Sequence, residues 1–556
     1  MKIKKQREMK NLVNIFLLSV VTILSGCTYL DYDESSYLKK EDVFTEFSRT
    51  KKFLTNIYSI LPSDFMSIDG AMRASATDEA IHVDDMSAIH KFNNGTWSAI
   101  QTLDAKWNSM YSGIYDVNMF LEEIKGQKWE ELQWREDYYE LMEQFNLYQY
   151  EARFLRAYFY FELMKRYGGV PLVTKILDRE EANTVKKATE EEIVNYIISE
   201  CDTVINFLPV TYLDIPGDET GRVTKGAAMA LKARTLLYFA SPLHNPGNDI
   251  QRWINAAKSS KSIIDSAWYH LESDYSDVVN NETSQELIFE RRQPESTSFE
   301  RANFPIGYEG GNTGTCPTQN LVNAYEMKDT GLPVNDPASG YDSIFPYNKR
   351  DPRLEKTIII NGSTWKGRTV EIWYGGANAE PKPFATKTGY YLKKYVIESV
   401  NLDPGNVSPK RHTWVIFRYG EVLLNFAEAM NEAYGPEDPA GMGMTALEAV
   451  NQIRQRAGMP DFPSGMTREQ FRKKLQNERR VELAFEDHRF WDVRRWKIGD
   501  QTVDIKGVVV RMNPFGGYIY EEKDVEKRVW DDKMNLYPIP QQELYINDNL
   551  TQNPGW

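Results

Sequence analysis

The stretch RFLRAYFYFELMKRYGG, residues 153–169, decides the fold class of this chain. Large side chains recur in it at helical spacing, because Phe154, Ala157, Tyr158 and Phe161 fall at i, i+3, i+4 and i+7. The glycines and proline at 168–171 supply a stop. The stretch predicts a helix that is buried on a wide face, and therefore a helical core.

Helical spacing recurs on both sides of this segment. We predict further helices over residues 44–61, 107–124, 224–240, 418–433 and 446–457. Alanines at 227, 228, 230 and 233 let the helix over 224–240 approach a neighbour closely. Helix pairs with small and aromatic seams indicate tetratricopeptide-type repeats, although no clean period of about 34 residues is present. The predicted fold is mainly α: a tetratricopeptide-type helical repeat scaffold with long loops and short β-hairpins.

Between residues 280 and 413 the helical period disappears. Gly, Asn, Pro and Thr dominate residues 307–318, 331–348 and 375–388, and long loops in a compact protein usually carry function. Residues 356–360, followed by Asn361 and Gly362, predict a strand and a hairpin turn.

The first residues have the pattern of a targeting signal rather than of a folded segment. A basic start and a short apolar core lead to Leu24, Ser25, Gly26 and Cys27, which predicts a lipoprotein signal peptide over 1–26 and lipidation of Cys27. A plain secretory signal with an incidental cysteine is the alternative. We expect a lipidated tether over 27–40 and one domain over 41–556, with a helical half (41–280) and a loop-rich and C-terminal helical half (281–556).

Composition excludes several classes of protein. The net charge of −14 disfavours nucleic acid and anionic lipid as partners. Cys201 and Cys316 are too few for a disulfide framework and are expected to be lone buried thiols, with a single bridge left open. Metal-ligand spacings, phosphate-binding loops and nucleophile elbows are absent from the sequence. No cofactor is predicted; a structural calcium ion is left open, although the sequence has no EF-hand loop.

Aromatic residues beside turn-forming residues suit a sugar ligand. Sugar rings offer an apolar C–H face and a rim of hydroxyls, so their recognition uses aromatic planes together with Asn, Asp and Arg side chains. The predicted glycan contacts are Trp97, Asn94, Asp78, Arg73, Tyr308, Asn312, Trp365, Trp373 and Tyr374. Packing within the loops explains each of the aromatic residues equally well.

The stretch NERRVELAFEDHRFWDVRRW, residues 477–496, concentrates acids and bases in the manner of a catalytic site. Its spacing favours another interpretation. Arg479 with Glu482, Glu486 with Arg489, and Arg489 with Asp492 are i,i+3 partners on a helix. We therefore predict a structural ion-pair network here and no catalysis.

An ordered series of segments resembles the SusD/RagB-like nutrient-uptake lipoproteins of Bacteroidetes outer membranes. The segments are Tyr29-Leu30-Asp31; Trp107, Tyr111, Ile114 and Asn118; residues 153–173 and 221–242; Ala324 to Met327; Arg350 to Arg353; residues 418–432 and 477–486; and YPIP (537–540) through QNPGW (552–556). The chain departs from the family at Asp487, where glycine is usual, which puts the local backbone geometry in doubt.

The resemblance implies a helical glycan-binding lipoprotein that is not an enzyme. It would sit at the cell surface, anchored by lipid to the outer membrane, as a lid over a SusC-like TonB-dependent transporter to which it delivers the glycan. It implies ligand contacts on loops and carries over no single contact residue. Peptide binding by the same architecture is the first alternative. A surface glycoside hydrolase is the second, with the pairs Asp78-Glu79 and Asp84-Asp85 as first suspects.

Overall fold

The computed structural model describes residues 40–213, 215 and 219–556. The predicted signal peptide, Cys27 and all but the last residue of the predicted tether lie outside the described residues. Residues 54–556 form one compact unit, and the described residues before them, 40–53, group separately from it.

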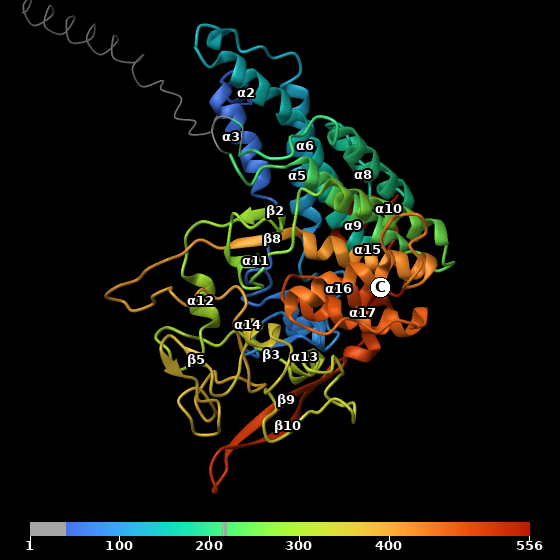
Figure 1. Cartoon of the computed structure of the whole chain (residues 1–556). Helices are drawn as coiled ribbons and strands as arrows, with labels where there is room; N and C mark the ends of the chain where they lie inside the picture. Colours follow the sequence, from blue (N-terminus) through green and yellow to red (C-terminus); the bar gives the residue numbers. More distant parts are fainter. Residues whose placement is uncertain (1–39, 214, 216–218) are drawn as a thin grey trace, which may run out of the picture. The chain divides into compact units, whose positions relative to one another are not determined.

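Helices dominate the described chain (Figure 1). The α-helices are α2 (Lys40–Phe44), α3 (Phe47–Tyr58), α4 (His90–Asn93), α5 (Lys106–Glu123), α6 (Tyr138–Tyr167), α7 (Arg179–Thr184), α8 (Glu190–Val204), α9 (Lys225–Ala240), α10 (Ile250–Ser266), α11 (Asp277–Asn280), α12 (Ser298–Asn303), α13 (Gln319–Ala324), α14 (Arg353–Thr357), α15 (Tyr419–Tyr434), α16 (Ala446–Ala457), α17 (Arg468–Glu482), α18 (Arg489–Arg495) and α19 (Gln541–Ile546). The 3₁₀ helices are η1 (Arg73–Ala76), η2 (Glu130–Leu132), η3 (Gly499–Thr502) and η4 (Asp532–Asn535).

The strands form short antiparallel pairs. The pairs are β1 (Ala80–His82) with β3 (Thr315–Pro317), β2 (Leu287–Arg292) with β8 (Thr413–Arg418), β4 (Ile358–Ile359) with β7 (Tyr391–Leu392), β5 (Thr364–Trp365) with β6 (Arg368–Thr369), and β9 (Asp504–Met512) with β10 (Tyr518–Lys527). This arrangement confirms the predicted mainly α fold.

The helices stack in a ladder. Successive contacts join α5 to α6, α6 to α8, α8 to α9 and α9 to α10, after which α15 packs on α10 and is covered by α16 and α17 (Figure 1). Close approach depends on small residues: a Cβ on Gly113 of α5 would lie 2.6 Å from the Phe159 ring of α6. The predicted core helix is confirmed, because every side chain of α6 from Phe154 to Tyr167 is buried.

The loop-rich region lies in sequence between α10 and α15, so two adjacent helices of the ladder are separated by about 150 residues of chain. The strand predicted over 356–360 is partly wrong. Residues 353–357 form α14, and only Ile358 and Ile359 are a strand. The predicted turn at 361–362 forms, with the Ser363 N–H donating to the Ile360 carbonyl at 3.1 Å, but the strand pairs with β7 rather than with the residues after the turn. Both isoleucines are buried against that distant strand.

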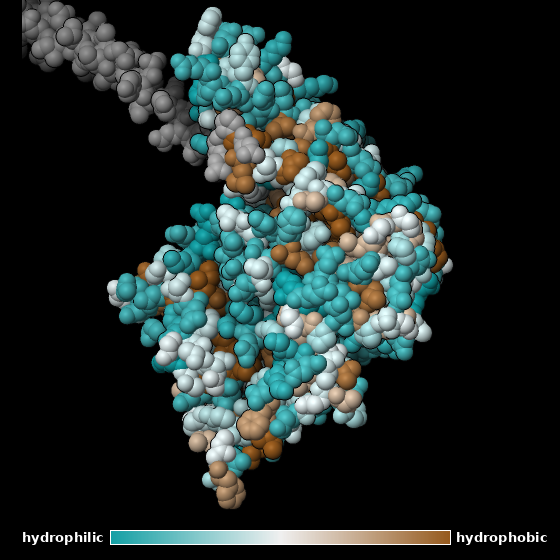
Figure 2. All heavy atoms as spheres, in the orientation of Figure 1, coloured by the Kyte–Doolittle hydropathy of each residue, from teal (hydrophilic) through white to brown (hydrophobic). Residues whose placement is uncertain are grey.

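The β9–β10 hairpin was not predicted. Its base packs on α13, its far end extends away from the helices, and its tip is coloured as apolar at the bottom of the space-filling view (Figures 1 and 2). Phe515 at this tip is 98% exposed. Among the described residues, none of the helices has the length and apolar character that a bilayer crossing requires.

Residues 477–496 build an ion-pair network, but with partners other than those predicted. The helix is interrupted between Glu482 and Arg489, which separates Glu486 from its predicted partner Arg489. Arg479 pairs with Asp492 at 2.8 Å, and Arg489 pairs with Asp78 at 2.8 Å, in place of their predicted i,i+3 partners. Instead, Arg418 at the end of β8 contacts Glu286 at 2.5 Å, Glu482 at 2.8 Å and Glu486 at 2.7 Å. The network is tertiary and holds α17 against β8 and α15.

The break contains the departure from the family pattern. Asp487 has φ of +65°, a conformation in which glycine is unstrained. Its carboxylate accepts hydrogen bonds from Arg73 at 2.5 Å and from the Trp491 indole at 3.1 Å. At this position aspartate strains the backbone, but its side chain forms hydrogen bonds that glycine could not form. Cys201 and Cys316 are free and buried, as predicted.

Candidate functional site

Helix α5 carries two parallel rows of side chains. Trp107, Tyr111 and Tyr115 recur every four residues and form an aromatic row. Asn108, Ser112 and Asp116 follow them one position later and form a polar row about 100° further around the helix. The solvent exposure of the aromatic row increases toward the C-terminal end of α5, because Trp107 is buried while Tyr115 is 49% exposed.

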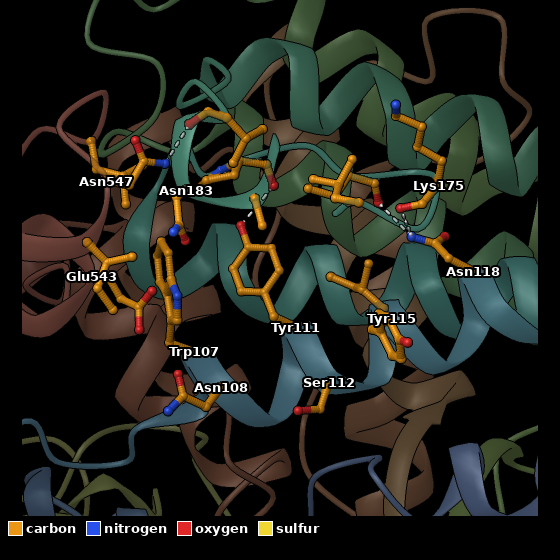
Figure 3. Close-up of a pocket in the computed structure, with 18 of the residues that line it drawn as sticks. Trp107, Asn108, Tyr111, Ser112, Tyr115, Asn118, Lys175, Asn183, Glu543 and Asn547 are labelled. Atoms are coloured by element: carbon orange, nitrogen blue, oxygen red, sulfur yellow. Dashed lines mark hydrogen bonds between the residues drawn. The ribbon is translucent and has the colours of Figure 1, made fainter. Parts of the chain in front are cut away.

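Two other segments face these rows and complete a groove of about 570 Å³ (Figure 3). One runs from Pro171 to Val185 and includes α7, and the other is α19 with the residues after it. The residues that line the groove from these segments are Pro171, Val173, Lys175, Leu177, Ala182, Asn183, Val185, Glu543, Ile546, Asn547 and Leu550. We call this space the α5 groove.

Hydrogen bonds fix the wall of the α5 groove. The Tyr111 hydroxyl donates to the Pro171 carbonyl at 2.8 Å, and Asn118 donates to the Lys175 carbonyl at 3.1 Å. Asn118 in turn accepts from Arg156 at 2.6 Å, and Asn547 ties the second wall to the Val185 carbonyl at 2.8 Å. The groove is therefore shaped before any ligand arrives, which lowers the entropy cost of binding.

Other polar groups in the groove have no partner among the described residues. Asn108, Ser112, Tyr115, Asp116 and Asn183 make no side-chain hydrogen bond with any residue that the structure describes. They are exposed or half-buried, so water satisfies them in the free protein. A ligand rich in hydroxyl groups can replace that water without leaving a polar group unpaired.

The groove lining includes two carboxylic acids, Asp116 and Glu543, and one lysine, Lys175. Burial raises the pKa of Asp116, and no basic group opposes this shift. Burial also raises the pKa of Glu543, while a hydrogen bond from the Trp107 side chain partly offsets the shift. Lys175 is paired with Glu181 at 2.6 Å on the exposed rim.

This arrangement of side chains can bind a ligand, but it does not indicate a catalytic reaction. The exposed Tyr115 ring presents an apolar plane, and the polar row presents hydrogen-bond donors and acceptors to the same groove. Among the residues that the structure describes, no three His, Cys, Asp or Glu side chains are grouped so as to hold a metal ion.

Several predicted contact residues lie in the interior instead. Trp97 is only 2% exposed, and its ring packs against Phe92 at 4.8 Å, Tyr537 at 5.2 Å and Trp556 at 4.5 Å between centroids. No ring face is left for a ligand. Asn94 is exposed, but its side chain accepts from the Thr96 hydroxyl at 2.7 Å and closes a local turn.

Trp365 and Tyr308 also pack inward. Trp365 is 1% exposed, and its carbonyl accepts a 3.0 Å hydrogen bond from the Tyr308 hydroxyl. The Arg368 guanidinium lies 4.2 Å above the Tyr308 ring. Asn312 is exposed and donates to the Arg301 carbonyl at 3.1 Å. Trp97, Trp365 and Tyr308 are buried because their loops fold back over these large apolar surfaces, which favours the alternative of packing within the loops.

Arg73 and Asp78 belong to buried ion pairs. Besides Asp487, Arg73 contacts Asp104 at 3.1 Å, and Asp78 contacts Arg489 at 2.8 Å. Both side chains are at most 5% exposed, so neither faces a ligand. The burial of Asp78 in an ion pair with Arg489 also disfavours it as a catalytic carboxylate of a hydrolase.

Trp373 and Tyr374 keep open ring surface. Trp373 is half-buried and Tyr374 is 56% exposed, on a loop held by a 2.8 Å hydrogen bond from the Tyr374 backbone to the Val510 carbonyl. Their role in ligand binding stays a prediction.

The sequence predicted a helix over 107–124 but no binding site on it. A usable signal was present, because the pairs Trp-Asn, Tyr-Ser and Tyr-Asp repeat every four residues between 107 and 116. An aromatic row beside a polar row differs from an ordinary core stripe, in which the neighbouring row is also apolar.

Known proteins match both halves of the chain. A family model described as the SusD family matches residues 267–556, and one described as starch-binding associating with outer membrane matches residues 28–237. A SusD-like protein of Formosa agariphila is 22% identical over 97% of each chain.

Solved structures agree with the family match. A SusD-like protein of Bacteroides fragilis is 29% identical, with a TM-score of 0.78 over 93% of this chain and 99% of that one. A SusD-like carbohydrate binding protein from the same organism is 26% identical, with a TM-score of 0.75 over 92% of this chain and 100% of the other. Because the first family model covers more than half of the residues, and these folds match nearly throughout, the chain belongs to the SusD family.

Proposed function

We propose that this protein binds a glycan in the α5 groove and releases it unchanged. The observation that carries the proposal is the pair of rows on α5. Tyr115 offers a ring plane for the C–H face of a sugar, and Asn108, Ser112 and Asp116 offer partners for its hydroxyls.

The relatives support a glycan as the ligand class. One solved relative is named a carbohydrate binding protein, and the model matching the N-terminal half carries a starch-binding description. The groove volume also falls within the usual range for small-ligand sites, about 300–1,000 Å³.

The proposal extends to the setting of the protein. Lipidation at Cys27 would anchor the chain to the outer membrane, at the cell surface, and a SusC-like TonB-dependent transporter would receive the glycan. The leader sequence supports the anchor, and family membership supports the transporter. A Cys27→Ser variant that stays in the membrane fraction of the native host would contradict the anchor.

Native gels that contain polysaccharides test the ligand class. We would use residues 28–556, which keep every described residue, and measure retardation on a panel of plant, host and microbial polymers. Tyr115→Ala is the test variant. Tyr139→Ala is the matched control, because Tyr139 is 81% exposed and does not line the groove.

The expected result is retardation by a polymer that Tyr115→Ala weakens by about tenfold or more and Tyr139→Ala leaves unchanged, since one stacked ring contributes roughly 1–3 kcal/mol in comparable aromatic sites. Loss of binding in Trp373→Ala or Tyr374→Ala instead would move the site to the loops. No retardation by any polymer, together with binding to a peptide library, would favour the peptide alternative. Released reducing ends would contradict binding without turnover.

A further inference from the structure

We propose that the α5 groove takes uncharged glycans and rejects those that carry carboxylate or sulfate groups. The inference rests on the proposed function and adds a substrate class to it. It comes from the uncompensated negative charge on the groove lining rather than from the aromatic row.

The first source of this charge is Asp116. It stands at the open end of the polar row, one residue after the exposed Tyr115 ring. It makes no hydrogen bond or ion pair with the described residues, and no basic side chain lies near enough to oppose the effect of burial on its pKa. Its carboxylate is therefore available to accept hydrogen bonds from a ligand.

The second source is Glu543, across the groove on α19. Its carboxylate lies beside the neutral Trp107 indole (Figure 3), and no described lysine or arginine forms an ion pair with it. Two half-buried carboxylates thus face the same space from opposite walls. Partial burial reduces screening by solvent and salt, so their field inside the groove is stronger than at an open surface.

The basic groups nearby do not neutralise them. Lys175 is the one lysine or arginine among the described groove-lining residues, and Glu181 holds its ammonium at 2.6 Å. Arg156 lies behind the wall, where its guanidinium donates to Asn118 at 2.6 Å and pairs with Glu200 at 3.3 Å. An anionic sugar would therefore meet two carboxylates and no free cation.

Sugar hydroxyls suit this lining because they donate to carboxylates. A hydroxyl group has one donor and can satisfy Asp116 or Glu543 without a charge penalty, whereas a uronate or sulfate is repelled. Arginine-based recognition of anions is absent from the groove lining that the structure describes.

The test compares a neutral polymer that binds residues 28–556 with the same polymer after its primary alcohols are oxidised to carboxylates. Affinity is measured by calorimetry in 20 mM and 500 mM sodium chloride. The charge variant is Asp116→Asn with Glu543→Gln. The control is Glu131→Gln with Glu309→Gln, which changes net charge equally at exposed positions outside the groove.

Wild type is expected to bind the oxidised polymer at least about tenfold more weakly at low salt, with a smaller difference at high salt. The charge variant should narrow that difference, and the control pair should leave it unchanged. Equal or tighter binding of the oxidised polymer by wild type would overturn the inference while leaving glycan binding intact. A difference that the charge variant fails to narrow would overturn it as well. Failure of every neutral and anionic polymer to bind would instead refute the proposed function.

Discussion

Replacement of Arg418 by methionine tests whether the buried ion-pair network holds β8 against α17 and the segment before β2. Arg418 is 1% exposed and bonds Glu286, Glu482 and Glu486, and it also donates to the Glu482 carbonyl at 2.9 Å. Methionine keeps most of the apolar stem but removes the cation. We expect a loss of about 3–5 kcal/mol in the free energy of unfolding at pH 7, the usual cost of breaking a buried pair from one side.

The loss should depend on pH with a defined sign. Burial raises the pKa of Glu482, but Arg456 and Arg418 outweigh it and hold the pKa well below its usual value. Burial also raises the pKa of Glu486, and Arg418 with Lys394 again brings it below the usual value. Depressed carboxyl pKa values stabilise the fold above the unfolded-state pKa, and that contribution fades as pH falls. The difference between wild type and Arg418→Met should therefore shrink below about pH 4.5.

Urea unfolding followed by circular dichroism at pH 7 and pH 4 measures both effects. Arg511→Met is the matched control, because Arg511 pairs with Glu521 at 3.4 Å on the exposed hairpin and should cost at most about 1 kcal/mol. A loss below about 1 kcal/mol for Arg418→Met at pH 7, or the same loss at both pH values, would refute the reasoning.

Three further perturbations follow from single residues. Burial raises the pKa of Glu79 to about 8, so stability associated with this group is present at low pH and is lost as pH rises through that value. Glu79→Gln should therefore raise the free energy of unfolding by roughly 3 kcal/mol at pH 7 and by almost nothing at pH 4. Denaturant titrations at both pH values measure this, and an equal effect at the two pH values would mean that Glu79 is ionised in the folded protein. Asp487→Gly relieves backbone strain of about 1 kcal/mol but removes a charged hydrogen bond to Arg73 of about 1.5–3 kcal/mol, so thermal unfolding should show a small net destabilisation, and a stabilised variant would contradict this balance. Phe515→Ser at the hairpin tip should shift stability by less than about 0.5 kcal/mol, because the ring is 98% exposed; a larger loss in urea titrations would mean that the tip packs on the body.

Much of the helical scaffold was readable from the sequence because helical periodicity is a local property. The helices predicted over 107–124, 224–240 and 446–457 match α5, α9 and α16 to within one residue at each end. Threonine capping boxes, such as Thr445 with Glu448, mark starts that the chain encodes on its own. The nature of the 477–496 segment as a structural ion-pair network was also correctly predicted.

The partners in that network could not be predicted, because they come from distant segments. Arg418 reaches Glu286 and Glu486 only after β2, β8 and α17 have been brought together. Charge spacing along one helix gives candidates for local pairs, but Arg479 and Arg489 pair with Asp492 and Asp78 from other segments instead.

In the candidate site, too, some features are predictable from the sequence and others depend on tertiary packing. The sequence by itself determined the helices and the repeated aromatic and polar pairs on α5, since both depend on spacing along a single segment. Tertiary structure alone decided that this face of α5 borders a groove, and that Trp97 and Trp365 are enclosed by chain from far away. The physical reason is that exposure depends on which neighbour covers a side chain, and that neighbour is chosen by the packing of the whole chain.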